Sequence, residues 1–381
     1  MTEQQADVVI VGGGFMGAAT AFFLRRRGVS AILVERGLVG QQASGVNFGN
    51  VRRQGRYLAQ LPLANRSREI WGRLNELIGE DLEFLVSGHI RVGYRDEHVE
   101  RMEKYAVDAR PYGLELDLIS GRRLRQLFPY LGPEIVMASY SAHDGHANPR
   151  LAAPAFGRAA ARAGARVFEN TETLDISKTG EDFVVSAAGG KTFRAPVVLV
   201  TAGAWGGRIS ASFGEPVPMK VQGPQMSVTE PVPYAIAPTI GVSSSIKEEV
   251  VYCRQIKRGN IIIGGCGHGP ADPDTRRAYV LPEHTLKQLR QLQRVVPAVK
   301  RLHIIRTWSG IEGYMQDDIP VMGPSARVPG LYYAFGFCGA GFQLGPGVGD
   351  VMAELIHTGN TTTPIEPFGI GRFAQAAAEQ K

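Results

Sequence analysis

Three glycines near the start of the chain are the first residues whose spacing predicts chemistry. Gly12, Gly14 and Gly17 form a Gly-x-Gly-x-x-Gly pattern directly after the apolar run Val8–Val11. In such a pattern the first glycine permits a tight turn and the second lets a pyrophosphate reach backbone N–H groups. The third lets a helix pack closely against a strand. The pattern therefore predicts a dinucleotide-binding turn.

An acidic residue follows where the ribose of a dinucleotide is expected. Glu35 comes directly after the apolar run Ala31–Val34, and a carboxylate there accepts hydrogen bonds from ribose hydroxyls. A 2′-phosphate would prefer a basic residue, so the sequence disfavours NADP, although Arg36 is adjacent. Phe15 and Met16 complete the contacts predicted for this turn. The pattern alone does not separate FAD from NAD.

The elements that position these residues form one βαβ unit. Both apolar runs are short and rich in β-branched residues, as is typical of central parallel strands. The helix predicted between them spans residues 15–27 and ends before Gly28. This order of strand, glycines, helix, strand and acid indicates a dinucleotide-binding unit more specifically than the glycine pattern alone does.

A small polar loop follows at residues 40–50, where an NAD-binding domain usually continues into further βα units. At this point the sequence resembles the D-amino-acid oxidase (DAO) superfamily of FAD-dependent oxidoreductases, which includes glycine oxidase and sarcosine oxidase. The resemblance implies that the loop runs past the pyrophosphate towards the isoalloxazine ring. The implied FAD contacts in the loop are Ala43, Ser44, Asn47, Gly49 and Asn50.

The resemblance continues through the middle of the chain. Residues 144–149 look like the family's entry into the second half of the FAD-binding domain, and Leu174 falls where a backbone contact to adenine is expected. The apolar strand at residues 197–202 leads into Gly203-Ala204-Trp205, which resembles the family's second FAD-contact strand. Gly203 and Trp205 are therefore implied FAD contacts.

The C-terminal part carries the most specific resemblance. Residues 308–313 resemble the family's Trp-x-Gly segment and imply a contact at Gly310. A last strand at 331–335 leads into a glycine-rich turn and a helix, an arrangement that directs N–H groups and a helix dipole at a ligand. In the family this ligand is the pyrimidine edge of the flavin. The implied contacts are Gly339, Ala340, Gly341, Phe342 and Gln343.

We expect an α/β fold in which a Rossmann-type FAD-binding domain is interleaved with an α+β substrate domain built on a mostly antiparallel sheet. The resemblance assigns residues 1–82, 144–214 and 307–381 to the FAD-binding domain. It assigns residues 83–143 and 215–306 to the substrate domain, where the strand-like runs on either side of residues 257–259 predict a hairpin.

Two arginines and a tyrosine are predicted to contact the substrate. A guanidinium is the best clamp for a substrate carboxylate because of its planar fork. Arg52 lies just beyond the polar loop, and Arg254 lies on the predicted hairpin beside Tyr252. The alternative is that these are surface charges or solvent-facing strand residues. No catalytic base is assigned, because the flavin itself performs the redox chemistry.

The resemblance implies an FAD-dependent oxidoreductase that oxidises the C–N bond of an amino acid or secondary amine by hydride transfer to flavin N5. The expected substrates are D-amino acids, N-substituted amino acids, opines or hydroxyproline. Two alternatives stay open. One is an FAD-dependent dehydrogenase or oxidase of a 2-hydroxy acid or polyol phosphate, and the other is a non-catalytic flavin-binding subunit. The sequence does not choose between an oxidase and a dehydrogenase.

The segment at residues 45–56 is most similar to the β subunits of heteromeric opine oxidases and hydroxyproline dehydrogenases. This implies partner subunits, which would carry any second flavin or iron–sulfur cofactor. The chain departs from the sarcosine oxidase pattern at Gln343, where that branch has a lysine. It also has no cysteine just upstream of Asp317, so non-covalent FAD is predicted.

Composition excludes several other classes. The three cysteines show no Cys-x-x-Cys spacing, so no metal or iron–sulfur site is predicted within the chain. The net charge of +6 is not accompanied by a nucleic-acid recognition motif. The least charged stretch, residues 330–349, is interrupted by Pro346 and many glycines, so no transmembrane segment is predicted. A soluble, cytoplasmic protein is expected.

Overall fold

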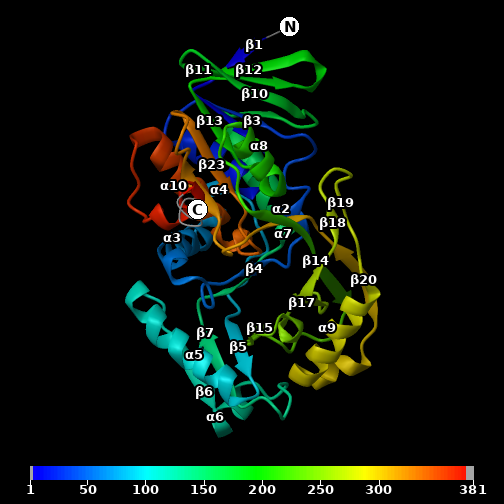
Figure 1. Cartoon of the computed structure of the whole chain (residues 1–381). Helices are drawn as coiled ribbons and strands as arrows, with labels where there is room; N and C mark the ends of the chain where they lie inside the picture. Colours follow the sequence, from blue (N-terminus) through cyan, green and yellow to red (C-terminus); the bar gives the residue numbers. More distant parts are fainter. Residues whose placement is uncertain (1–2, 375–381) are drawn as a thin grey trace.

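The computed structural model describes residues 3–374, and its centre is a six-stranded sheet (Figure 1). The strands lie in the order β22-β23-β13-β2-β3-β9, and all neighbours are parallel except β22 and β23. Their bounds are β2 Val8–Val11, β3 Ala31–Val34, β9 Arg166–Phe168, β13 Val197–Val200, β22 Val321–Pro324 and β23 Leu331–Phe335. The predicted βαβ unit is thus present, with its helix α1 at Phe15–Arg26.

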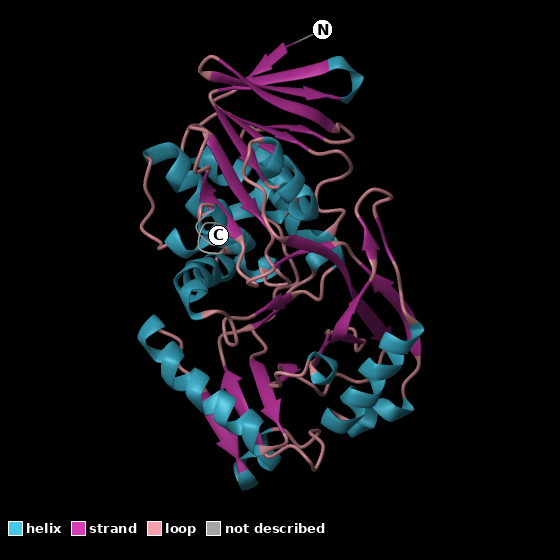
Figure 2. Ribbon diagram, viewed as in Figure 1, coloured by secondary structure: helices cyan, strands magenta, loops and turns pink. Residues whose placement is uncertain are grey.

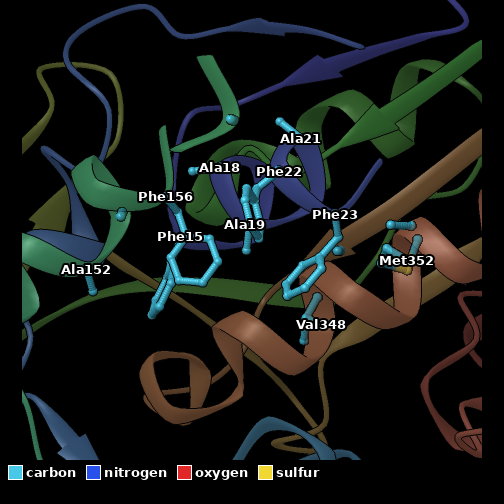
Figure 3. Close-up of a cluster of buried hydrophobic side chains, with 14 of the residues drawn as sticks. Phe15, Ala18, Ala19, Ala21, Phe22, Phe23, Ala152, Phe156, Val348 and Met352 are labelled. Atoms are coloured by element: carbon cyan, nitrogen blue, oxygen red, sulfur yellow. The ribbon is translucent and has the colours of Figure 1, made fainter. Parts of the chain in front are cut away.

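Helices cover one face of this sheet. Alternate residues of β2 point to opposite faces, so Val8 and Ile10 pack against the helices. Helix α1 lies against α7 (Pro149–Arg162) and α10 (Gly341–Thr358). Figure 3 shows the resulting core, in which Phe15, Phe22, Phe23 and Phe156 from α1 and α7 meet Val348 and Met352 of α10.

A second, four-stranded sheet covers the opposite face, at the top of Figure 1. Its order is β1-β12-β11-β10, and Phe183, Val185 and Phe193 pack there against Val9 and Val11. The bounds are β1 Glu3–Gln5, β10 Thr173–Thr179, β11 Asp182–Ala187 and β12 Lys191–Ala195. The central sheet is therefore buried on both faces, which explains its continuous apolar strands.

A nine-stranded, mostly antiparallel sheet lies in the lower half of Figures 1 and 2. Its order is β20-β14-β17-β16-β15-β5-β7-β6, and β21 also pairs with β14. The bounds are β5 His89–Gly93, β6 Asp117–Ser120, β7 Met137–Ser141, β14 Met219–Thr229, β15 Thr239–Val242, β16 Val251–Gln255, β17 Ile261–Gly269, β20 Ile304–Ser309 and β21 Glu312–Met315. The predicted hairpin is formed by β16 and β17.

One predicted domain boundary needs correction. The boundary at residue 307 falls inside β20, and β21 pairs with β14 through four registered residues. Strand pairing holds both strands in the nine-stranded sheet, so this sheet extends to residue 315. The other strands of each sheet come from the ranges predicted for that domain. We retain the division into two interleaved domains as a proposal.

The remaining elements are short connections or helices that flank the sheets. The helices are α2 Ala43–Val46, α3 Leu61–Gly72, α4 Leu74–Ile78, α5 Asp96–Ala109, α6 Gly121–Leu127, α8 Gly206–Ser212 and α9 Pro282–Val295. The strands are β4 Asn50–Val51, β8 Gly145–His146, β18 Ala271–Asp272 and β19 Arg277–Ala278. Among residues 3–374 no helix combines the length and apolar character needed to cross a membrane.

Candidate functional site

A cavity with a volume of about 560 Å³ lies at the carboxyl ends of the central parallel strands. The turns after β2, β3, β13 and β23 all contribute to its walls. Loops at this edge of a parallel sheet are the usual ligand-binding position in open α/β folds. We call this space the nucleotide cavity.

The glycine turn after β2 brings backbone segments closer than any side chain would allow. A Cβ on Gly17 would lie 2.1 Å from the carbonyl oxygen of Gly12. Gly12 has φ +111°, and a Cβ there would lie 2.7 Å from the carbonyl oxygen of Thr201. The Thr201 hydroxyl also donates to the Gly12 carbonyl at 2.7 Å. These contacts hold the start of α1 against β2 and β13 and leave the backbone of the turn facing the cavity.

Glu35 is fixed at the far end of the same cavity. Its carboxylate accepts hydrogen bonds from the N–H of Gly13 at 2.6 Å and from the N–H of Gly37 at 2.8 Å. Each carboxylate oxygen has further lone pairs, so Glu35 can still accept from a ribose. The Arg36 guanidinium lies 3.6 Å from the ring centre of Trp205 and closes this end of the cavity.

The polar loop after β3 is attached to the start of α1. The Ser44 hydroxyl accepts a hydrogen bond from the Phe15 N–H at 2.9 Å. The Asn47 side chain donates to the Ala43 and Ser44 carbonyls, and it accepts from the Gly49 N–H at 2.8 Å. The loop therefore keeps one shape along the cavity. A Cβ on Gly14 would meet only the Ser44 hydroxyl, at 3.3 Å, so Gly14 faces open space.

Most residues predicted to bind the dinucleotide line the nucleotide cavity. These are Gly12, Gly14, Phe15, Met16, Glu35, Arg36, Ala43, Ser44, Asn47, Leu174, Gly203, Trp205, Gly339, Gly341 and Phe342. The tight turns, the two helix starts at α1 and α10 and the carboxylate at Glu35 together fit an FAD pyrophosphate, flavin edge and ribose. Their individual contacts with FAD remain predictions.

Six other predicted contact residues are not among those that line the cavity: Gly17, Gly49, Asn50, Gly310, Ala340 and Gln343. Gly17 and Gly310 permit close packing, and a Cβ on Gly310 would lie 2.2 Å from the Val46 side chain. The Gln343 amide donates to the Ala64 carbonyl at 2.8 Å inside the helix layer.

The other three residues lie in the polar loop and in the last turn. Gly49 packs against Ala147 and Arg254, and Asn50 pairs with His146 between β4 and β8. The Ala340 carbonyl accepts a hydrogen bond from Arg56 at 3.2 Å. The contacts of these six residues with FAD stay predictions.

A half-buried pair of a carboxyl and a phenol lies on the wall that the nine-stranded sheet contributes. Glu312, on β21, lines the nucleotide cavity and accepts a hydrogen bond from the Tyr314 hydroxyl at 2.8 Å. Burial raises the pKa of Glu312, and the Tyr314 hydrogen bond offsets part of this rise. A Cβ on Gly339 would lie 3.7 Å from both side chains. The pair therefore adjoins the turn predicted to face the flavin.

Tyr252 interacts electrostatically with both Glu312 and Arg52, although neither Tyr252 nor Arg52 lines one of the two described cavities. The Tyr252 ring packs edge-on against Phe48, with ring centres 4.7 Å apart. Burial raises the pKa of Tyr252, the Glu312 charge raises it further, and the Arg52 charge lowers it. Burial lowers the pKa of Arg52. Their contact with a substrate stays a prediction.

Arg254 has a different environment from the one expected. Its Nε donates to the Phe48 carbonyl at 2.6 Å, and its Nη1 lies 3.1 Å from Nδ1 of His146. Arg254 lines neither of the two described cavities. Arg254 thus connects β16 to the polar loop, and its contact with a substrate carboxylate stays a prediction.

Sequence reasoning missed several residues that line cavities. Glu312 lay inside the Trp-x-Gly segment without an assigned role, and the signal for it was an acid directly before Gly313. Cys338 also lines the nucleotide cavity. Its thiol donates to the Gly336 carbonyl and accepts from the Met315 N–H, and burial raises its pKa to about 12.

Missed arginines surround a second cavity of about 230 Å³, which we call the arginine cavity. It is lined by Arg56, Arg91 and Arg101. These residues are far apart in sequence and carry no motif, so only the tertiary structure brings them together.

Comparison with known proteins identifies the same cofactor class. Residues 7–355 match the family described as DAO, FAD dependent oxidoreductase. The chain is 28% identical to glycine oxidase of Geobacillus kaustophilus, over 96% of this chain and 97% of the relative. It is 27% identical to an opine oxidase subunit of Rhizobium meliloti, over 98% of this chain and 100% of the relative. The fold matches L-proline dehydrogenase from P. horikoshii with a TM-score of 0.91 at 27% identity. The match covers 98% of this chain and 99% of that structure.

Proposed function

The chain belongs to the DAO family of FAD-dependent oxidoreductases, and on this basis we propose that it oxidises the C–N bond of an amino acid or secondary amine. The supporting relatives are named for amino-acid or amine substrates, namely glycine, an opine and L-proline. When bound, FAD supplies the acceptor for the hydride that leaves the carbon next to nitrogen.

One observation supports an amine more than a hydroxy acid or a polyol phosphate. A half-buried carboxyl, Glu312, adjoins the Gly339 turn in the nucleotide cavity, and no described residue forms an ion pair with it. An ammonium or secondary amine gives this carboxylate a charged hydrogen-bond donor, whereas a hydroxyl is neutral and a phosphate would be repelled. Glu312 would thus orient the amine and take up a proton from it, which leaves the nitrogen neutral for oxidation.

The test is anaerobic reduction of the purified yellow protein. D- and L-amino acids, N-carboxyalkyl amino acids, prolines, 2-hydroxy acids and glycerol phosphate would be added separately, and the visible flavin band recorded. We expect bleaching by one class of amine and by no hydroxy acid. Bleaching by hydroxy acids alone would reject the proposal.

Glu312→Gln is the matched variant for the role of the carboxyl. It keeps the size and the hydrogen bond of the side chain but loses its charge. We expect the concentration of amine giving half-maximal bleaching to rise about tenfold or more, the range of a lost charge-assisted hydrogen bond. The flavin content should stay that of the wild type, and an unchanged half-saturation point would remove Glu312 from amine binding.

We further propose that the chain acts as the catalytic component of a heteromeric dehydrogenase. Its similarity to the opine oxidase subunit extends over the whole length of that relative. The prediction is that amines reduce the flavin of the isolated chain, but that O₂ reoxidises it much more slowly than an artificial dye does. Fast reoxidation by O₂ with stoichiometric hydrogen peroxide would identify a self-sufficient oxidase.

A further inference from the structure

A narrow hairpin projects from the nine-stranded sheet at residues 270–279. Its strands β18 and β19 pair Ala271 with Ala278 and Asp272 with Arg277. In Figure 1 it is the yellow hairpin, labelled β18 and β19, that extends from this sheet towards the upper half of the molecule. We call this hairpin the arm.

The arm has a fixed shape at both of its ends. At the tip, the Asp272 carboxylate accepts hydrogen bonds from the N–H groups of Asp274 and Thr275, at 2.8 and 3.3 Å, and from the Thr275 hydroxyl at 2.8 Å. At the base, a Cβ on Gly223 of β14 would lie 3.0 Å from the Pro270 carbonyl oxygen, so the arm packs closely against β14. The arm is therefore a stiff extension of the nine-stranded sheet.

The tip of the arm reaches the end of the nucleotide cavity that is predicted to bind adenosine, where Glu35 is fixed. Three residues that line the cavity, Glu172, Trp205 and Arg208, contact the arm, and we call them the rim. The Trp205 indole donates a hydrogen bond to the Pro273 carbonyl at 2.9 Å. The arm thus holds residues of the cavity wall.

Two ion pairs of opposite sense join the arm to the rim. Asp274 of the arm pairs with Arg208, and Arg276 of the arm pairs with Glu172, each at 2.5 Å. The crossed charges fix the position in which the arm meets the rim. The four side chains are 41% to 72% exposed. Exposed ion pairs contribute little free energy and are weakened by salt, so these contacts can open while both sheets stay folded.

The other end of the nucleotide cavity has no such openable contact in its wall. Ile311, Ala334 and Phe335 line the cavity beside the turn predicted to face the flavin, and they are 3%, 1% and 0% exposed. Close-packed core residues separate only at a large cost in free energy, whereas exposed ion pairs separate easily. The adenosine end is therefore the end that can open.

We propose that the arm is a clasp on the adenosine end of the nucleotide cavity, and that bound FAD leaves only after the arm has released the rim. The arm belongs to the nine-stranded sheet, and the rim belongs to segments around the central sheet. Movement of one sheet relative to the other would thus govern exchange of the cofactor. The clasp acts on retention of FAD and is independent of which substrate is oxidised.

The experiment uses the purified, FAD-loaded protein and measures the rate at which bound FAD exchanges for an excess of isotope-labelled FAD. Asp274→Asn combined with Arg276→Gln removes both ion pairs of the arm and keeps the size of the side chains. We expect this double variant to exchange FAD about threefold faster or more, the effect of losing two exposed ion pairs. The matched control, Asp117→Asn with Arg123→Gln, removes an exposed ion pair of 2.6 Å at β6 and should exchange FAD at the wild-type rate.

Salt provides a second measurement. Exchange in the wild type should become faster between about 0.01 M and about 1 M NaCl, because screening weakens exposed ion pairs, and the double variant should lose most of this increase. Wild-type exchange in the double variant, an equal acceleration in the control, or a salt dependence that the double variant keeps in full would each overturn the proposal. If the double variant does not fold, Asp274→Asn alone takes its place, with an expected acceleration of about twofold.

Discussion

A side chain added at Gly14 should prevent the binding of FAD without preventing the chain from folding. A Cβ there meets only the Ser44 hydroxyl, at 3.3 Å, and otherwise projects into the nucleotide cavity. The backbone around it needs no rearrangement to accept a larger residue. Its substitution therefore acts on the space assigned to the pyrophosphate and leaves the packing of α1 intact.

We predict that Gly14→Val abolishes retention of FAD because the isopropyl group occupies the pyrophosphate position. The measurement is the ratio of flavin to protein absorbance after purification. Gly72→Val is the control, since a Cβ there meets only the end of the Arg68 side chain at 3.3 Å. A Gly14→Val protein with the full yellow colour of the wild type would refute the phosphate-turn assignment.

Cys338 bears on how the flavin is attached. The thiol lines the nucleotide cavity, but burial raises its pKa to about 12, so it is protonated at neutral pH and a weak nucleophile. We predict that acid precipitation releases all of the flavin into the supernatant. Flavin fluorescence that stays with the unfolded polypeptide on a denaturing gel would contradict the non-covalent attachment.

His146 gives the protein a specific sensitivity to acid. Burial, with a contribution from the Arg254 charge, lowers its pKa to about 3. Between pH 6.5 and pH 3 the unfolded chain binds a proton at this residue and the folded chain does not, so stability falls as the pH falls through this window. From pH 7.5 to 5.0 the loss is at most about 2 kcal/mol.

The predicted outcome for His146→Asn is a smaller loss of unfolding free energy over that pH interval. Asparagine keeps a hydrogen-bond acceptor near Arg254 but does not titrate. Urea unfolding at pH 7.5 and pH 5.0 measures the difference for each protein. Equal losses in the variant and the wild type would show that His146 is not the source of the acid sensitivity.

Among the elements, the contact between α1 and α10 fixes the position of the two glycine-rich turns relative to each other. Both helices begin at the nucleotide cavity, and their axes approach closely because small residues lie between them. A Cβ on Gly349 would lie 2.4 Å from the Ala19 Cβ and 2.7 Å from the Ala19 carbonyl carbon. Figure 3 shows this interface, with Ala19 of α1 facing α10.

Gly349→Ala should destabilise the protein by about 1–3 kcal/mol, because the added methyl forces the helices apart. In an ordinary helix the same change stabilises by about 0.5–1 kcal/mol, so the sign of the effect is diagnostic. Chemical unfolding gives the free energy. Gly72→Ala, at the end of α3, should leave stability equal or higher, and a stabilised Gly349→Ala would show that the helices are not in close contact.

In the molecule as a whole, the nucleotide cavity joins the central sheet to the nine-stranded sheet. The Trp308 indole donates to the Val46 carbonyl at 2.8 Å, and Arg254 donates to the Phe48 carbonyl at 2.6 Å, so both sheets contact the polar loop. Ile311 and Glu312 complete the cavity from the side of the nine-stranded sheet. A ligand bound there stabilises both sheets together.

We therefore predict that FAD protects β21 from amide hydrogen exchange as well as β2. Binding at 100 times the dissociation constant adds about 2.7 kcal/mol to the stability of everything it contacts. AMP, which lacks the flavin half, should protect the region of Glu35 but leave β21 at its apo rate. Equal protection of β21 by AMP and FAD would contradict the placement of the flavin end.

The cofactor class, and the residues that line the cavity at the first glycine turn, could be predicted from the order of residues alone. Gly12, Gly14 and Glu35 act through local backbone geometry, and a short stretch of chain specifies that geometry completely. The two strands and the helix that position them carry equally local signals, because apolar runs and glycines mark where each element begins and ends.

Which residues face the substrate, in contrast, depends on how distant segments pack. Arg254 is held by the Phe48 carbonyl and by His146, both of which are remote from it in the sequence. Glu312 reaches the nucleotide cavity, and the arginines of the arginine cavity meet one another, only through the packing of strands and helices. Burial and charge at those positions come from neighbours remote in sequence, so no local pattern could reveal them.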